Sequence, residues 1–314
     1  MTEPATFGVD LGGTNTRVAV VDADGTIVDH RRAPTPPTLD GIVEHIADVV
    51  RELAPQRPDA RALGMGAAGM VDRTGMVHYA PNVPAFVRAP LRERLAAAID
   101  MPVVVDNDAN AAVIGELTHG AARNQREVLL VTLGTGVGGG IISNGLLQRG
   151  AHGFGGEIGH FQVDPDGPRC ACGQIGHWEA VASGTALGEL GRARAAAGDA
   201  PSVVGLAGSA EAVAGVHVGE AAQRGAADAI AIVEEYALRV AIGLAGLVNI
   251  LDPELVVVSG GLVELDDLLL TPLRAAFAGR IEGSEYRPAV PIVRAELGGD
   301  AGVIGAAALA RGIG

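Results

Sequence analysis

The chain contains one pattern of strand, glycine turn and strand twice. VDLGGT at residues 9–14 aligns with VTLGTG at residues 131–136, an offset of 122 residues. In both copies an apolar strand runs into glycines, a β-branched strand follows, and an Asp-Gly or Asn-Gly turn leads to a third strand. Two such units indicate a duplicated architecture, which constrains the fold more than any other feature.

The rest of the chain supplies alternating helices and strands. Apolar periodicity predicts a helix from about Leu39 to Leu53, ending before Pro55. A strand is expected in ALGMGAAGMV, a helix around PLRERLAAAI, a strand in MPVVVDND with a helix directly after it, and a strand in PELVVVSGGLVE with a Gly-Gly turn and a helix after it. The Gly/Ala-rich residues 195–222 predict one short helix and a mobile connection. The fold class expected is α/β, a duplicated fold similar to the actin-like (ribonuclease H-like) sugar kinases, with two domains and an interdomain cleft.

The charge balance excludes several classes of protein. The net charge is −14, all 23 basic residues are arginine, and lysine is absent. A Walker P-loop, a protein-kinase site and a Schiff-base enzyme all need lysine. An acidic chain also disfavours binding to nucleic acid. The start, MTEPATFGVDLGG, has no signal-peptide pattern, and neither long apolar run qualifies as a membrane span, so a cytoplasmic protein is expected.

Three glycine turns follow apolar strands, after Asp10, Leu133 and Ser259. Gly134, Gly136 and Gly139 match the dinucleotide fingerprint, but a strand follows them where that motif requires a helix. Each turn alone could be a simple β-turn; together they suit a nucleotide held between two domains. Without lysine, phosphate charge would fall to backbone N–H groups, threonine hydroxyls and Mg²⁺. The candidate ATP and Mg²⁺ residues are Asp10, Gly12, Gly13, Thr14, Thr135, Gly136, Gly260 and Gly261, with Asp10 as the Mg²⁺ residue.

Three polar residues, Asp106, Asn107 and Asp108, end a predicted strand, where α/β proteins bind ligands. Asp106 or Asn107 could cap the following helix. Asp108 is then the candidate general base, which takes a proton from a sugar hydroxyl that attacks a γ-phosphoryl group. A carboxylate suffices because the alcohol loses its proton late in a loose transition state.

Several motifs together resemble the ROK (repressor, open reading frame, kinase) family, most closely its bacterial glucokinase branch, over essentially the whole chain. They are DLGGTNTRVAVVDADG, APNVP, VVVDNDANAAVIGE, LGTGVGGGI, GGEIGH and CACGQIGHWEAVASG. The resemblance implies a sugar kinase that uses ATP and Mg²⁺, a structural zinc (Zn²⁺), and a homodimer or homotetramer. It implies Asp108 as the catalytic base and places sugar-binding residues at Asn82, Asn107, Asp108, Glu157, His160 and Glu179.

Under this resemblance the chain divides into a small N-terminal domain and a large domain. Residues 1–108 would form the small domain, completed by a C-terminal helix at 300–314, and residues 109–299 the large domain with a zinc-binding loop at 160–177.

The only two cysteines lie in the zinc motif, and this motif departs from the family pattern. The resemblance implies a histidine and three cysteines as ligands; here the positions hold His160, Cys170, Cys172 and His177. Three interpretations stay open: a Cys₂His₂ zinc site, an empty site, or a strained disulfide. Because histidine is itself a zinc ligand, its presence at 177 favours zinc. His160 would bind zinc through one ring nitrogen and the sugar through the other, and Glu179 would be held in the same pocket.

The expected function is ATP-dependent phosphorylation of glucose at the 6-hydroxyl. A second hypothesis is a ROK kinase for N-acetylmannosamine, N-acetylglucosamine, mannose or fructose. A third, less favoured, is a sugar-responsive regulator, whose DNA-binding domain would have to precede Asp10 and finds no room in this acidic chain.

Overall fold

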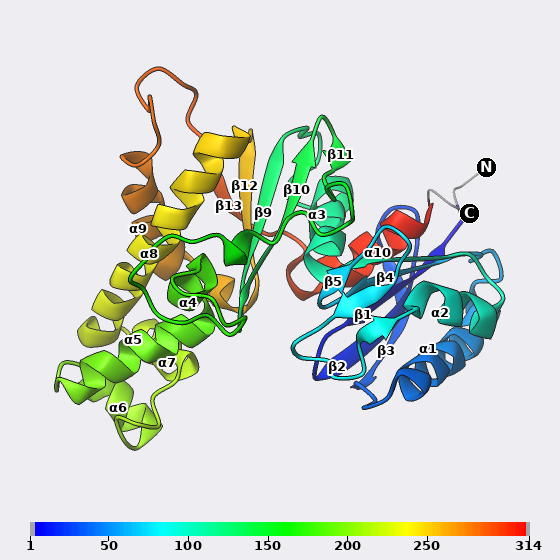
Figure 1. Cartoon of the computed structure of the whole chain (residues 1–314), viewed down its shortest axis with the longest axis horizontal. Coiled ribbons are helices and arrows are strands. Elements are labelled where there is room, and N and C mark those ends of the chain that lie inside the picture. The colour runs from blue at the N-terminus through cyan, green and yellow to red at the C-terminus, as the bar shows by residue number, and fades with distance from the viewer. Residues whose placement is uncertain (1–3, 312–314) are drawn as a thin grey trace. The chain divides into compact units, whose positions relative to one another are not determined.

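Two five-stranded sheets with the same topology form the framework of the protein (Figure 1). In the first sheet the order is β3-β2-β1-β4-β8, and in the second it is β11-β10-β9-β12-β13. Each has an antiparallel half and a parallel half. The sequence repeat is therefore confirmed as a structural duplication. The strands are β1 (Thr6–Leu11), β2 (Asn15–Val21), β3 (Ile27–Pro34), β4 (Leu63–Ala67), β8 (Val103–Asn107), β9 (Val128–Leu133), β10 (Val137–Ser143), β11 (Leu146–Leu147), β12 (Leu255–Ser259) and β13 (Ile292–Arg294).

The computed structural model describes residues 4–311. Its contacts divide the chain into unit 1 (Met1–Leu130, Gly140–Gly156 and Ala295–Gly314) and unit 2 (Val131–Gly139 and Glu157–Arg294). The sequence placed a domain boundary at residue 108, whereas this division keeps α3 (Asp108–His119) in unit 1. The reason is that α3 packs on β4 and on α10 (Ala301–Arg311), the C-terminal helix.

One face of the first sheet packs against α1 (Leu39–Leu53) and α2 (Leu91–Ile99). Helix α1 has the predicted bounds, because Thr38 caps its first turn and an apolar stripe faces the sheet. A 3₁₀ turn, η1 (Ala54–Gln56), follows it. A small sheet of β5 (Met70–Val71), β6 (Val77–Tyr79) and β7 (Val87–Ala89) lies between β4 and α2 in the chain.

The other face of the first sheet packs against α10. Two glycines permit the close approach: a Cβ at Gly8 would lie 2.1 Å from the Val303 carbonyl oxygen, and one at Gly64 would lie 1.7 Å from that of Ala306. Helix α10 follows the 3₁₀ turn η4 (Gly298–Asp300). The fully buried Glu116 of α3 accepts hydrogen bonds from the backbone N–H groups of Glu296 and Leu297, which fixes the chain that leads into η4 and α10.

In unit 2 the long helix α8 (Ala227–Leu251) packs on α4, α5, α6, α7 and α9. Trp178 is fully buried against Gly243 of α8, where any side chain would collide with the indole. The buried Tyr236 hydroxyl donates to the Ala182 carbonyl at 2.5 Å. The other elements of unit 2 are η2 (Ile158–His160), α4 (Trp178–Ala182), α5 (Gly184–Ala196), α6 (Pro201–Ala207), α7 (Gly215–Gln223), η3 (Gly261–Leu265) and α9 (Asp267–Ala278).

The prediction for residues 195–222 is wrong in its secondary structure. This stretch contains the end of α5, the whole of α6 and most of α7, in place of one short helix. Val203 of α6 and Val218 of α7 are fully buried. The high glycine and alanine content masked the apolar periodicity on which helix prediction rests.

No helix within residues 4–311 is long and apolar enough to cross a membrane.

Candidate functional site

The junction of β8 and α3 holds the candidate base. Asn107 is the N-cap of α3, and its side-chain oxygen accepts from the backbone N–H groups of Ala109 and Asn110, at 2.9 and 3.2 Å. Its amide group donates to the Gly69 carbonyl at 3.1 Å. Of the two capping candidates, Asn107 is therefore the cap, and Asp108 begins the helix itself.

Asp108 accepts a hydrogen bond from the Ala109 backbone N–H at 2.9 Å, and the Asn107 side chain also hydrogen-bonds to it. Burial raises the pKa of its carboxyl above the usual range, and these hydrogen bonds offset only part of the effect. A raised pKa makes the carboxylate a stronger base, because catalytic efficiency grows as the pKa approaches the working pH.

Asp10 on β1 is the second unusual carboxylate of unit 1. Its pKa is raised to about 6, first by burial and then by the negative charge of Asp108, while Arg17 and Arg32 lower it. The carboxyl lies against Gly302 in the first turn of α10, where a Cβ would come within 3.2 Å of the Asp10 Cγ. A divalent cation would relieve the repulsion between the two carboxylates, so the donor set suits Mg²⁺.

The turn that follows β1 packs against the loop of the APNVP motif. A Cβ at Gly13 would lie 2.5 Å from the Asn82 carbonyl oxygen. Gly13, Thr14 and Asn82 are exposed, and Gly12 is half-buried. Unit 1 thus brings together the predicted phosphate turn and one predicted sugar-binding residue. The side chains of Thr14 and Asn82 are both available to a ligand.

Unit 2 contains a cavity of about 590 Å³, a volume typical of sites for small organic ligands. Helices α5 and α7 and the turn η3 line it, together with the glycine turn after β9. Thr135 and Gly261, both predicted, lie in its wall. Its main lining residues are Gly134, Thr135, Gly184, Thr185, Gly188, Arg192, Gly215, Val216, Gly219, Glu220, Gln223, Gly261, Leu262, Glu264 and Leu265.

Sequence reasoning missed the two helices that line this cavity, although a signal was present. Gly184 and Gly188 on α5 are four residues apart, as are Gly215 and Gly219 on α7. A Cβ at Gly188 would lie 2.9 Å from the Gly215 backbone nitrogen, so glycine is required where the helices meet. Paired glycines at helical spacing could therefore have identified the missed wall.

Two of the predicted nucleotide residues instead have packing partners. A Cβ at Gly136 would lie 2.4 Å from a carboxylate oxygen of Glu179. Gly260 has a positive φ of 89° and packs on the Leu133 backbone. Neither lines the cavity described above, and Asp10, Gly12, Gly13 and Thr14 belong to unit 1.

The four predicted metal ligands lie together in unit 2. The ligand atoms of His160, Cys170, Cys172 and His177 are all within 4.8 Å of one another. Cys170 Sγ is 3.8 Å from His160 Nδ1, and Cys172 Sγ is 3.2 Å from His177 Nδ1. Both cysteines are free. Two thiolates and two imidazoles at this spacing fit a tetrahedral zinc site after small adjustments.

Glu179 lies beside this cluster, in the first turn of α4. One carboxylate oxygen accepts from the Val137 backbone N–H at 3.0 Å, and the other accepts from the Cys170 thiol at 3.3 Å. Glu157 is exposed and precedes η2, which ends at His160. Unit 2 therefore holds the other predicted sugar-binding residues: His160 belongs to the cysteine and histidine cluster, Glu179 contacts it, and Glu157 lies just before η2.

Comparison with known proteins identifies the family to which this chain belongs. The ROK family profile matches residues 6–313. The chain belongs to the ROK family. A glucokinase of Streptomyces coelicolor is 42% identical over 98% of this chain and 97% of its own length, and one of Thermotoga maritima is 36% identical over 96% of each chain. N-acetylmannosamine kinases are also similar; that of Escherichia fergusonii is 31% identical over 98% of both chains.

Among solved structures, this ROK protein resembles a ROK family glucokinase from Streptomyces griseus in complex with glucose and AMPPNP. The TM-score is 0.87 and the identity 42%, over 98% of this chain and 99% of that one. The predicted actin-like α/β fold is thereby confirmed. The identity is high enough to support a proposal on activity as well as fold.

Proposed function

We propose that this ROK protein transfers the γ-phosphoryl group of ATP to the 6-hydroxyl of glucose, with Asp108 as the general base. The observation that carries the proposal is the placement of Asp108, a carboxylate of raised pKa at the first residue of a helix that follows a sheet strand. The similarity to a glucokinase bound to glucose and AMPPNP supports the choice of sugar and phosphoryl donor.

Three sugar-binding residues are proposed in unit 1, namely Asn82, Asn107 and Asp108. Asn107 uses its oxygen to cap α3 and one amide hydrogen to bind Gly69, and its side chain also hydrogen-bonds to Asp108, so it fixes the position of the proposed base. Asp108 accepts the hydrogen of the reacting hydroxyl. A proton leaves this hydroxyl only as the phosphoryl group arrives, so the main role of Asp108 is to orient the oxygen.

Glu157, His160 and Glu179 are the sugar-binding residues proposed in unit 2. His160 turns Nδ1 toward Cys170, which leaves Nε2 for a sugar hydroxyl. Glu179 is held by the Val137 N–H, so its carboxylate is oriented before the sugar binds. Carboxylates and imidazoles that are fixed in this way can form hydrogen bonds with sugar hydroxyls and lose little side-chain entropy on binding.

ATP is proposed to bind the cavity of unit 2. Val216, Leu262 and Leu265 offer apolar surface for a base, and the N–H groups of the glycine turns can approach the phosphates. Mg²⁺ at Asp10 would supply the positive charge that lysine supplies in other kinases, since this chain has none.

Zinc is proposed at the cluster of His160, Cys170, Cys172 and His177. The cluster joins η2, which carries His160, to the turn before α4, which carries Glu179. Bound zinc would hold the two sugar-binding side chains in register.

Metal analysis and chelation test this part of the proposal. Purified protein should contain about one zinc per chain, and removal of the metal should weaken glucose binding before the protein unfolds. Trp178, the only tryptophan, lies between His177 and Glu179 and gives a fluorescence signal for both events. The control variant is Gln174→Ala, because Gln174 lies in the same loop but outside the cluster. Fully active protein without metal would rule out the role proposed for zinc.

The identity of the sugar is tested by a coupled assay of ADP release. Glucose should give the highest kcat/KM among glucose, mannose, fructose, N-acetylglucosamine and N-acetylmannosamine. N-acetylmannosamine is the specific alternative, because kinases for it are 31% identical to this chain. A higher kcat/KM with any other sugar would replace glucose in the proposal and leave the phosphoryl transfer unchanged.

The proposal includes that the protein is a cytoplasmic enzyme of glycolysis, that it forms a homodimer or homotetramer, and that it has no nucleic acid partner. Size-exclusion chromatography with light scattering measures the oligomer directly.

A further inference from the structure

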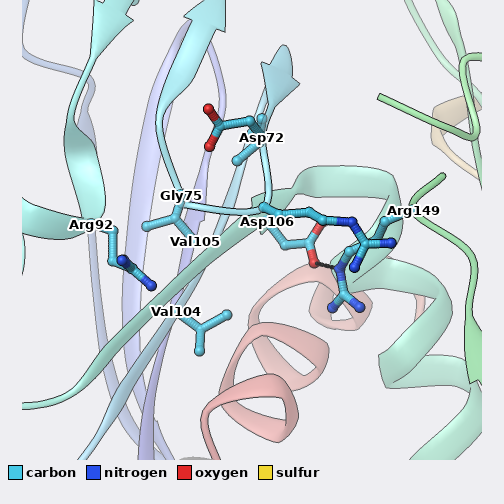
Figure 2. Close-up of a pocket in the computed structure, with 9 residues that line it drawn as sticks. Asp72, Gly75, Arg92, Val104, Val105, Asp106 and Arg149 are labelled. Carbon is cyan, nitrogen blue, oxygen red and sulfur yellow. Dashed lines mark hydrogen bonds and ion pairs between the residues drawn. The ribbon is translucent and has the colours of Figure 1, made fainter. Parts of the chain in front are cut away.

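A second cavity, of about 200 Å³, lies within unit 1 beside the edge strand β8 (Figure 2). Three arginines line it, Arg73, Arg92 and Arg149, together with Asp72 and Asp106. We propose that this cavity binds a small phosphate-bearing anion, at a site separate from the proposed ATP and sugar sites.

The charge in the cavity is positive although the chain is strongly acidic. Three arginines and two aspartates line the cavity, a local balance of one positive charge in a chain with a net charge of −14. Asp72 does not pair with the arginines. It accepts from the N–H groups of Thr74 and Met76 at 2.8 and 3.1 Å, and it is 2.8 Å from His78 Nε2, so the turn between β5 and β6 uses its oxygens.

Two of the arginines have no carboxylate partner. The guanidinium of Arg73 donates to the Gly150 carbonyl, which carries no net charge. The guanidinium of Arg92 has no partner within residues 4–311. Its aliphatic part lies over Gly75, since a Cβ there would lie 2.7 Å from the Arg92 Cβ and 3.1 Å from its Cδ, and its backbone N–H donates to the Gly75 carbonyl at 3.2 Å. The residue as a whole is exposed, so a ligand can reach its guanidinium group.

Arg149 offers the third set of donors. Its Nε donates to Asp106 at 2.6 Å, and Asp106 is 7% exposed at its side chain. Its two terminal nitrogens have no partner in the part of the chain that the structure describes. Figure 2 shows Arg92 and Arg149 on opposite sides of the cavity, with Asp106 next to Arg149. A ligand in the cavity can therefore receive hydrogen bonds from two directions.

These donors select the chemical class of the ligand. Guanidinium groups bind phosphate oxygens in planar, bidentate pairs, and several of them together favour a doubly charged anion over a carboxylate. Sites for drug-sized ligands usually measure about 300–1,000 Å³, so a cavity of about 200 Å³ suits a small anion or the phosphate end of a larger one. Inorganic phosphate and a sugar phosphate share this chemistry.

The cavity is connected to the candidate base through β8. Asp106 precedes Asp108 by two residues, and its other oxygen accepts from the Asn107 N–H and the Asn110 side chain, both at 2.8 Å. An anion that draws Arg149 away from Asp106 would loosen this junction. A bound anion should thus change turnover, a consequence that rests on the proposed kinase activity.

Isothermal titration of the full chain tests the site, with glucose and AMPPNP present at saturating concentrations to fill the proposed active site. Inorganic phosphate and glucose 6-phosphate are titrated separately into the natural protein and into the double variant Arg73→Gln/Arg92→Gln. Arg94→Gln is the matched control, because Arg94 lies on the same helix, is exposed, pairs with Asp40 and does not line the cavity.

The natural protein and the control should bind one anion per chain, and the double variant should bind it at least about tenfold more weakly, because it loses two charged donors. Tighter binding of the sugar phosphate than of phosphate would identify a sugar phosphate as the ligand, and equal binding would identify phosphate alone. Absence of saturable binding, or equal affinity in the double variant, would overturn the site.

Turnover is measured in the same three proteins with and without phosphate. Phosphate should change kcat in the natural protein and in the control but not in the double variant. Binding without any change in kcat would remove the link to Asp108 and leave the anion site in place. A protein with no sugar kinase activity would contradict the proposed function, yet titration without sugar and nucleotide would still report on the cavity.

Discussion

The two sheets share one topology but differ in the side chains at equivalent positions. Asp10 on β1 aligns with Thr132 on β9, and the strand β8, which leads to Asp108, corresponds to β13, which ends at Arg294. Asp10 has a pKa raised to about 6, whereas Thr132 is neutral and accepts the Gly138 N–H at 3.1 Å. At this position the first sheet thus carries a buried carboxyl group, and the second carries a hydroxyl that holds the turn between β9 and β10 by a hydrogen bond.

The glycine turns differ in the same way. Gly13, in the first turn, packs on the Asn82 backbone, while its counterpart Thr135 lines the cavity of unit 2. Duplication provides two similar sheets. A few side-chain differences at the strand ends give the first sheet the proposed base and Mg²⁺ residue, and give the second a turn that lines the proposed ATP cavity. The comparison therefore predicts unequal effects of substitution at matched positions.

The largest effect is expected at Asp108. Asp108→Asn should lower kcat by about 10²–10⁴, because the neutral amide holds the reacting hydroxyl less well and cannot accept its proton. Glucose binding, followed by Trp178 fluorescence, should remain within a few-fold. Arg294→Gln, at the end of the matching strand of the second sheet, should leave kcat within a few-fold. Near-normal turnover in Asp108→Asn would show that the base is wrongly assigned.

A smaller effect is expected at Asp10. Asp10→Asn should raise the Mg²⁺ concentration for half-maximal activity by about tenfold or more, since a carboxylate is exchanged for an amide at the proposed metal ligand. The measurement is the initial rate as a function of Mg²⁺ concentration. An unchanged Mg²⁺ dependence would place the cation elsewhere.

Asp10 also makes stability depend on pH. Its folded pKa, about 6, lies above the ordinary value of 3.8, so the folded protein binds more protons between these values. Stability should fall as the pH rises from about 4 to 6, by up to about 3 kcal/mol. Without Mg²⁺, Asp10→Asn should be more stable than the natural protein at pH 7 and equal to it near pH 4. Urea unfolding with a chelator at both pH values measures the difference, and a natural protein whose Asp10-dependent stability rises with pH would contradict it.

The smallest effect is expected at Thr132, the counterpart of Asp10. Thr132→Val removes the hydrogen bond to the Gly138 N–H and should cost about 1–2 kcal/mol of unfolding free energy. The cost should be the same at pH 4 and pH 7, because no ionisable group is involved. Its Mg²⁺ dependence should match that of the natural protein. A pH-dependent loss would mean that the two strand ends are more alike than their side chains suggest.

Local patterns were sufficient for most elements and for the cluster of cysteines and histidines. The bounds of α1 were predicted because apolar periodicity runs from Leu39 to Leu53 and Pro55 follows it closely. The four ligand positions were implied by the resemblance to the ROK zinc motif. They lie near one another in the structure, and all four fall within a stretch of eighteen residues, from His160 to His177.

Helices α6 and α7 were missed because their small residues carry little periodic signal. Their stability comes from packing on α5 and α8, which no local pattern reports. The same holds for the wall of the cavity in unit 2, which is assembled from separate segments between Gly134 and Leu265, residues that are 131 positions apart in the chain.

The sequence by itself determined the duplication, the identity of the reactive side chains and the exclusion of lysine chemistry, since these depend on residue order and residue type. Only the tertiary structure decided that Asn107 caps α3 and that Asp10 is close enough to Asp108 to raise its pKa. It also gathered three arginines from separate segments around one cavity beside β8. Distances between segments are set by packing of the whole chain, so the pKa values and cavities that depend on them cannot be read from a local pattern.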